Sequence, residues 1–109
     1  MIEQHPKEEN LFIIKEIETN PTTTQRVLSE KLGISLGKTN YLLKELIKKG
    51  LIKAKNFSEN PGKMQKIHYL LTKQGIDHKI QLTQHFLKKK KEEYNFIKQE
   101  WERLSGVIK

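Results

Sequence analysis

The fold is decided by the stretch TTTQRVLSEKLGISLGKTNYLLKELIKKG, which occupies residues 22–50. The threonines at its start can cap a helix, and Gly33 can adopt the left-handed conformation that ends one. Ser35 can then cap a second helix. The apolar residues of that helix repeat at helical spacing and are Leu42, Leu43, Leu46 and Ile47. The stretch therefore predicts two short helices joined by a tight turn, the second of them over residues 36–49.

The segments on either side extend this pattern. Residues 8–19 carry apolar residues at helical spacing, and Asn20-Pro21 ends the run because the residue before a proline is pushed out of helical torsions. After residue 50, segments 51–57 and 66–72 alternate apolar and polar residues around a break at Asn60-Pro61-Gly62, which predicts a β-hairpin. Helices followed at once by a hairpin are typical of a winged helix-turn-helix. We therefore expect a mainly α fold with a small β-hairpin wing, formed by residues 1–72.

The carboxy-terminal part of the chain predicts one long helix over residues 73–109, with Thr72 as its cap. A seam of residues alternately four and three apart runs along it: Ile76, Ile80, Thr83, Leu87, Lys90, Tyr94, Ile97, Trp101, Leu104 and Ile108. Such a heptad pattern is typical of coiled coils, and the helix is longer than a core of this size can cover. We therefore predict a homodimer held by this coiled-coil-like arm. The expected dimer contacts are Ile76, Ile80, Leu87, Tyr94, Ile97, Trp101 and Leu104.

Two alternatives for this helix stay open. Lys90 would be costly inside a two-stranded core unless its ammonium reaches solvent, so the run Lys88–Lys91 could mark a bend between two apolar patches. The helix could instead fold back and place Phe86 and Phe96 on the winged domain.

The charge of the chain points to a polyanionic partner. Lys and Arg total 21 against 13 Asp and Glu in 109 residues, which gives a net charge of +8. Residues 26–72 hold ten basic and three acidic residues, a net +7, whereas residues 1–25 sum to -3 and residues 73–109 to +4. A basic winged domain favours nucleic acid as that partner.

Several classes of protein are disfavoured by what the sequence lacks. Without cysteine there is neither a disulfide framework nor a thiolate metal site, and a reducing compartment is expected. The amino terminus does not read as a signal peptide and no apolar stretch reaches membrane-spanning length, so we expect a cytoplasmic protein without membrane contact. Asp77 is the one aspartate, and the histidines lack the spacing of a metal site, so neither an enzyme nor a metal or cofactor is expected.

If residues 36–49 form the recognition helix of a helix-turn-helix, their outward face would contact DNA in the major groove. The residues that we expect on that face are Ser35, Leu36, Gly37, Lys38, Asn40, Tyr41 and Lys44. Asparagine can bridge an adenine edge, lysine can reach guanine acceptors, and hydroxyl groups commonly meet phosphate. The wing, residues 58–66, would grip the DNA backbone or enter the minor groove with the help of nearby lysines. These are Lys53, Lys55, Lys63 and Lys66.

The same residues resemble the MarR-type winged-helix regulators, and within them the compact branch associated with bacterial exopolysaccharide gene clusters. The likeness rests on Gln25-Arg26, Leu32–Lys38, Asn40-Tyr41, Lys49-Gly50 and Tyr69–Thr72. It implies a dimeric DNA-binding transcription factor, with Gln25 and Arg26, and Thr24 before them, as further DNA contacts. Thr39 departs from the pattern, since an inward apolar residue is usual there. The chain has little room for the ligand pocket of larger members, so a small-molecule effector is not expected.

A protein-interaction module and an RNA-binding, antitermination-like module remain as alternative functions. A protein-docking face would carry aromatic anchors where this one has Lys38, Asn40 and Lys44. A basic hairpin is compatible with RNA, although a recognition helix fits the wide groove of B-form DNA better than the narrow groove of A-form RNA. We therefore predict a dimeric, sequence-specific DNA-binding transcriptional regulator.

Overall fold

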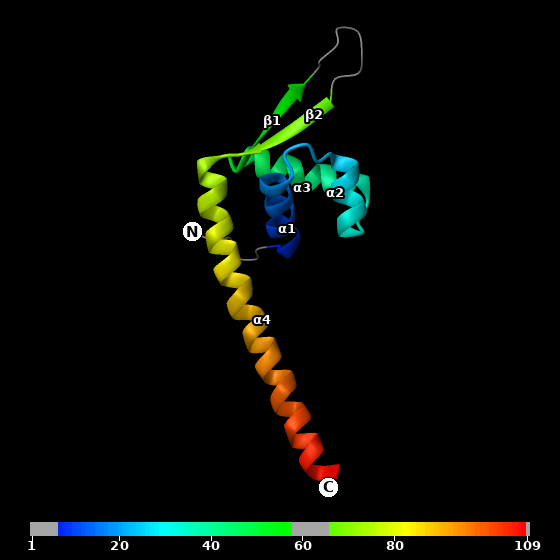
Figure 1. Cartoon of the computed structure of the whole chain (residues 1–109), viewed down its shortest axis with the longest axis vertical. Coiled ribbons are helices and arrows are strands. Elements are labelled where there is room, and N and C mark those ends of the chain that lie inside the picture. The colour runs from blue at the N-terminus through cyan, green and yellow to red at the C-terminus, as the bar shows by residue number, and fades with distance from the viewer. Residues whose placement is uncertain (1–6, 58–65, 109) are drawn as a thin grey trace.

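The computed structural model describes residues 7–57 and 66–108, and it shows the predicted order of helices, hairpin and final helix (Figure 1). The elements are α1 (Glu8–Thr19), α2 (Gln25–Leu32), α3 (Leu36–Lys48), β1 (Ile52–Phe57), β2 (Lys66–Leu71) and α4 (Lys73–Ile108). The predicted fold class is confirmed: the chain is mainly helical, with a winged helix-turn-helix followed by a long C-terminal helix. The expected ends of α1, α3 and both strands lie within one residue of the observed ones.

The helix ends form where capping residues were expected. Thr24 Oγ1 accepts a hydrogen bond from the amide of Val27 at 3.2 Å and opens α2, and Gly33 ends that helix with a φ of 66°. Ser35 Oγ accepts from the amide of Lys38 at 3.0 Å and opens α3 only two residues later. These caps fix the tight turn between α2 and α3, which sets the direction of α3.

The hairpin is antiparallel, with Ile52 opposite Leu71 and Lys55 opposite His68. Neighbouring residues of a strand point to opposite faces, so Lys53 and Lys55 lie on the face away from buried Ile52. The hairpin leads directly into α4, because Thr72 Oγ1 donates to the carbonyl of Gly50 at 2.6 Å and accepts from the amide of Gly75 at 3.0 Å. The base of the wing is thus tied to the start of α4.

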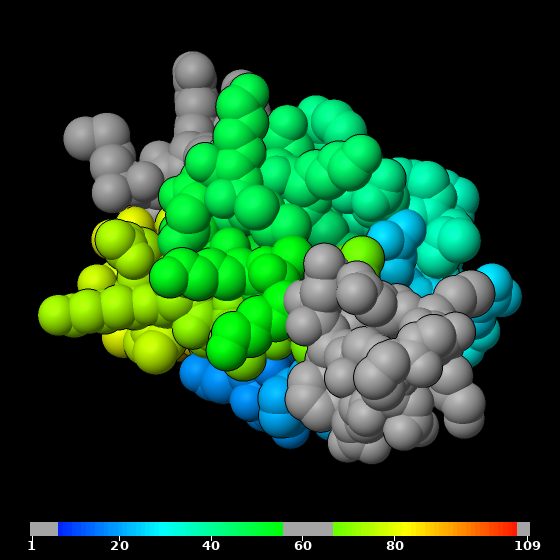
Figure 2. Space-filling view, turned by 90° about the horizontal axis from the view of Figure 1, so that it is seen from above, coloured from blue at the N-terminus to red at the C-terminus, as the bar shows by residue number. Residues whose placement is uncertain are grey.

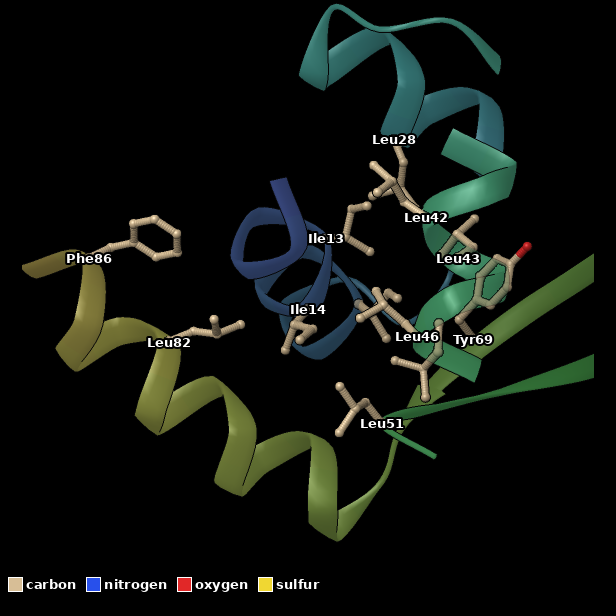
Figure 3. Close-up of a cluster of buried hydrophobic side chains, with 12 residues drawn as sticks. Ile13, Ile14, Leu28, Leu42, Leu43, Leu46, Leu51, Tyr69, Leu82 and Phe86 are labelled. Carbon is tan, nitrogen blue, oxygen red and sulfur yellow. The ribbon is translucent and has the colours of Figure 1, made fainter. Parts of the chain in front are cut away.

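The hydrophobic core lies between α1, α3 and the first half of α4 (Figure 3). Its fully buried side chains include Ile13 and Ile14 of α1 and Leu42, Leu43 and Leu46 of α3. Leu82 and Phe86 of α4 close the core from the other side of α1, with exposed fractions of 1% and 5%. The first half of α4 therefore packs as part of the same core, and the expected domain division at residue 72 stays a prediction.

Thr39 sits at the core-facing position of α3 where an apolar residue was expected from the resemblance. It is fully buried, and its hydroxyl donates to the carbonyl of Ser35 at 2.9 Å. This bond satisfies the buried hydroxyl within the helix, so the departure from the family pattern leaves the packing of the turn intact.

Beyond Lys90, α4 continues as one unbroken helix that extends away from the winged domain (Figure 1). The molecule consequently measures 72 × 28 × 21 Å. The helix is not interrupted at Lys88–Lys91, where a bend was one of the expected alternatives (Figure 1). Of the two phenylalanines that a folded-back helix would bury, Phe86 does pack on the core, whereas Phe96 is 70% exposed. No helix in the described part of the chain combines the length and apolar character needed to cross a membrane.

Candidate nucleic-acid interface

The exposed face of α3 is the centre of the candidate interface. Four positions of α3 with helical spacing lie opposite its buried side: Gly37, Tyr41, Lys44 and Lys48. A Cβ added to Gly37 would meet nothing within 4 Å, so the chain's own packing does not require a glycine there. Glycine in an exposed helix costs about 1 kcal/mol relative to alanine, and its place on this face suits close approach of an external partner.

Lys48 belongs to this face, although the sequence pattern did not place it among the expected contacts. A signal is present in the sequence, because Lys48 follows Lys44 by four residues and Tyr41 by seven, which places all three on one side of a helix. Its position in the closing Lys-Lys-Gly turn obscures that signal.

Lys38 and Asn40 do not join Tyr41 and Lys44 on this face as expected. Residues that are two positions apart are separated by about 200° around a helix of 3.6 residues per turn. Lys38 and Asn40 therefore lie on opposite flanks of α3. Asn40 is half-buried. Lys38 is exposed but its Nζ lies 2.9 Å from Oε2 of Glu9 in α1. Both flank the outward face, and any contact of Lys38 with a phosphate competes with Glu9.

The acidic start of the chain neutralises lysines elsewhere. In α1, Glu8, Glu9, Glu16 and Glu18 form ion pairs with Lys90, Lys38, Lys31 and Lys79 respectively. The basic residues that pair with no acidic side chain in the described part of the chain include Arg26, Lys44, Lys48, Lys53 and Lys55. Part of the positive charge left over therefore lies on the start of α2, α3 and β1, and another part lies along α4, where Lys88, Lys89, Lys91 and Lys98 pair with no acidic side chain among the described residues.

Three expected contacts at the start of α2 have different surroundings. Arg26 is exposed. Gln25 donates from Nε2 to the carbonyl of Leu36 at 3.1 Å, so its side chain joins the start of α2 to the start of α3. The hydroxyl of Thr24 is used as the cap of α2. Gln25 thus acts on the placement of α3 and Thr24 on the start of α2, and Leu36 is 45% exposed.

The wing carries Lys53 and Lys55 on its outer face, both exposed. In the view onto the wing end, the surface of α3 and the surface of β1 lie next to each other (Figure 2). Lys66 begins β2, and Lys63 with most of the expected wing tip, residues 58–65, lies outside the described residues. The described lysines of β1 therefore extend the cationic surface of α3 along the hairpin.

The seam of α4 is exposed along its whole described length. Ile76, Ile80, Leu87, Tyr94, Ile97, Trp101 and Leu104 are between 43% and 68% exposed. Lys90, the charged member of the seam, turns its Nζ to Oε2 of Glu8 at 3.3 Å. The apolar residues expected at a dimer contact are thus uncovered in the single chain, and the lysine among them is paired with α1.

In the described part of the chain, no group of three or more His, Asp or Glu side chains comes together. His78 is half-buried near the start of α4. Burial, and secondly the charge of Lys49, lower the pKa of its imidazole below the ordinary value.

Residues 11–53, from α1 to the start of β1, match the family of winged helix-turn-helix DNA-binding domains. No curated protein matches the chain. Among solved structures, the chain is similar to the PcaV transcriptional regulator of Streptomyces coelicolor, with a TM-score of 0.67 and 16% identity over 81% of this chain and 60% of that one.

Two further structures are similar to the chain. FabT of Streptococcus pneumoniae, solved in complex with DNA, has a TM-score of 0.60 and 24% identity over 81% of this chain and 60% of its own. ZitR of Lactococcus lactis, a zinc-responsive MarR family member, has a TM-score of 0.60 and 20% identity over 77% of this chain and 56% of its own. The chain covers less than two thirds of each of these proteins. At these identities the likeness shows the fold, a winged helix-turn-helix like that of a MarR-family protein.

Proposed function

We propose that this protein is a dimeric, sequence-specific regulator of transcription that binds double-stranded DNA. The observation that carries the proposal is the cationic surface of α3 and β1, where Lys44, Lys48, Lys53 and Lys55 pair with no acidic side chain among the described residues. In this arrangement α3 enters the major groove, and the wing contacts the backbone or the adjacent minor groove.

The shape of this surface favours duplex DNA over the other candidate partners. An α-helix fits the major groove of B-form DNA, whereas the corresponding groove of A-form RNA is too narrow. A protein-docking face is rich in aromatic anchors, and the outward face of α3 offers Tyr41 alone among lysines. RNA and protein partners are therefore the alternatives that binding experiments must exclude.

The exposed seam of α4 supports the proposed dimer, as does the way that helix-turn-helix proteins bind DNA. A two-fold axis places two recognition helices on half-sites one helical turn apart. Each seam exposes seven apolar side chains, including Tyr94 and Trp101, and aromatic residues contribute most strongly to interfaces. The second copy would cover these side chains. The resemblance to the exopolysaccharide-associated branch makes promoters of such genes the first natural targets to examine.

The proposal is tested by comparing two lysine variants that remove the same charge. Lys44→Gln removes a cation from the outward face of α3, and Lys88→Gln removes one from an exposed position of α4. Lys44→Gln should weaken binding to duplex DNA and lower the slope of log K against log salt by about one unit for each phosphate that is no longer neutralised. Lys88→Gln should bind as the unaltered protein does.

Fluorescence anisotropy with a labelled duplex at several salt concentrations measures both quantities. Equal weakening in the two variants would mean that net charge, and not the α3 surface, controls binding. Tighter binding of single-stranded RNA than of duplex DNA would favour the RNA-binding alternative.

A further inference from the structure

The charged residues that border the seam differ between its two sides in the distal half of α4. Around the apolar positions Tyr94, Ile97 and Trp101, one side carries Glu93 and Glu100, and the other side carries Lys91 and Lys98. In heptad notation Tyr94 and Trp101 are a positions and Ile97 is a d position, so the glutamates occupy g and the lysines occupy e. An acidic g row and a basic e row determine the relative direction of two paired helices.

We propose that α4 pairs with α4 of a second copy in the parallel direction, a step that rests on the proposed dimer. In a parallel pair, a g residue faces the e residue of the following heptad in the other helix. Glu93 of each copy then faces Lys98 of the other, and the two-fold axis generates this attraction twice.

The antiparallel pairing of the same helices brings like charges together. In that direction g rows face g rows and e rows face e rows. Glu93 and Glu100 of one copy would approach the same glutamates of the other, and Lys91 and Lys98 would approach the same lysines. Opposed like charges are unfavourable on paired helices, so the charge pattern selects the parallel dimer.

The ion pairs within the single chain leave the selecting residues available. Glu100 is paired with Arg103 of its own helix, whereas Glu93 comes only within 4.0 Å of Lys90. Lys98 pairs with no acidic side chain among the described residues. The attraction between Glu93 and Lys98 of the partner copy therefore replaces no strong contact of either residue.

In a parallel dimer each seam residue faces the same residue of the other copy, and Lys90 is the one seam residue for which this would bring two like charges together. Its Nζ lies 3.3 Å from Oε2 of Glu8 in α1. Each ammonium is thus neutralised from its own chain and directed towards α1. Thr83 is the other polar residue of the described seam, and it is small enough to be accommodated.

The proximal half of the seam has room for a partner side chain. A groove of about 370 Å³ follows it, lined by Glu18, Ile76, Lys79, Ile80, Thr83 and Gln84. Side chains of a second α4 can insert here as knobs between the seam residues and the end of α1. A parallel pair that uses this groove holds both winged domains at the same end of the arm, where one duplex can reach both copies of α3.

Single-cysteine variants test the direction of the helices, because the natural sequence contains no cysteine. Leu104→Cys and Ile80→Cys each place one thiol near one end of the seam, and Gln99→Cys places one on the opposite side of α4. In a parallel dimer, Leu104→Cys and Ile80→Cys should each cross-link to themselves under mild oxidation, and a mixture of the two should give no additional cross-linked species. Gln99→Cys should remain uncross-linked.

An antiparallel dimer gives the reverse result, because the two ends of the seam then meet each other. Cross-linking that needs the mixture of Leu104→Cys and Ile80→Cys would overturn the parallel arrangement and leave the proposed DNA-binding dimer in place. A monomer in sedimentation equilibrium would overturn the parallel arrangement together with the dimer. DNA binding of the unaltered protein, measured separately, shows whether the proposed function fails as well.

A charge exchange provides an independent test with opposite signs for the two directions. In a parallel dimer, Lys98→Glu places two glutamates opposite each other and should raise the dimer dissociation constant roughly tenfold. Adding Glu93→Lys restores opposite charges and should recover the original constant to within about threefold. In an antiparallel dimer, Lys98→Glu would remove one of the like charges from the facing e rows and tighten association. Tighter association of Lys98→Glu would therefore contradict the proposal.

Discussion

The two halves of α4 form one continuous helix, yet their surroundings are opposite. In the first half, Leu82 and Phe86 are buried against α1, and Gly75 packs directly on the backbone of residue 51. In the second half, Tyr94, Ile97 and Trp101 are each more than 60% exposed. Both halves are rich in apolar residues, so apolar content alone does not distinguish a helix that the chain covers itself from one that a second chain covers.

The difference between the halves has a geometric origin. The packed part of α4 extends only to Lys90, which pairs with Glu8 at the start of α1, because α1 is 12 residues long against 36 for α4. Contiguous apolar surface that a protein leaves uncovered usually marks an interaction site. In the proposed function, the short helices of the winged domain serve DNA binding, and the surplus length of α4 serves association.

The largest effect is expected from charges placed in the exposed half. Ile97→Glu combined with Trp101→Glu would bring four glutamates into the dimer contact and remove its apolar anchors, which should shift the dimer equilibrium by roughly 4 kcal/mol or more. Sedimentation should show a folded monomer. As a control, Gln99→Glu adds a charge on the opposite side of α4 and should stay dimeric. A double variant that remains a dimer would show that the seam is not the contact.

A matched pair of glycine substitutions compares the two halves directly. A Cβ at Gly75 would collide with the carbonyl oxygen of Leu51 and with the Leu71 side chain, whereas a Cβ at Gly106 would meet nothing within 4 Å. Gly75→Ala should lower the free energy of unfolding by about 3 kcal/mol. Gly106→Ala should leave it unchanged or raise it by up to about 1 kcal/mol through helix propensity. Urea unfolding of both variants at one protein concentration measures the difference, and similar decreases would contradict it.

Asn40→Ala tests whether the flank of α3 reads bases. Asparagine pairs bidentately with adenine, so its removal should weaken binding to a preferred duplex by about 1 to 3 kcal/mol and leave binding to random DNA nearly unchanged. Because Asn40 is half-buried, the fold of the variant is checked by circular dichroism. An equal decrease on random and preferred duplexes would assign Asn40 to the packing of α3.

Glu9→Gln tests whether α1 restrains the DNA-binding surface. Removing this carboxylate frees Lys38 for a phosphate and should strengthen DNA binding by about 1 kcal/mol or less, the usual range for exposed pairs. Glu16→Gln releases Lys31 of α2 instead and is the matched control. If both variants gain equally in a titration, the gain reflects net charge and not the release of Lys38.

The smallest effect is expected at His78. Its pKa is lower in the folded protein than in the unfolded chain, so the unfolded chain takes up the proton first. The stability that depends on neutral His78 should be present above about pH 6.5, the ordinary histidine pKa. It should be lost progressively as the pH drops below that value. His78→Gln should reduce the drop in melting temperature between about pH 7.5 and pH 5 by roughly 1–2 °C. An unchanged pH dependence would mean that other groups control it.

The fold was predictable from the sequence because its signals are local. Thr24, Gly33 and Ser35 each act within a turn of their own position, and the hairpin is bounded by turn residues. The burial of Leu82 was not predicted, because the heptad seam lies on another side of α4. Leu82 and Phe86 are four residues apart, so a second apolar side of that helix is present in the sequence.

The candidate site was predictable in kind but not in its arrangement. The basic character of α3 and β1 follows from composition, whereas the pairing of Lys38 with Glu9 joins residues that are 29 positions apart and depends on how α1 packs. The role of Gln25 likewise depends on the turn that brings the carbonyl of Leu36 within 3.1 Å. Such tertiary contacts decide which lysines remain available, and no local pattern reports them.

Sequence-specific binding by a dimer is measured by selecting bound duplexes from a random DNA pool with the purified protein near physiological salt. Sequencing of the enriched fraction should reveal an inverted repeat whose half-sites are about ten base pairs apart, since a dimer with two recognition helices binds that way. If protein shown to be folded and dimeric enriches no sequence, it is not a sequence-specific regulator of transcription.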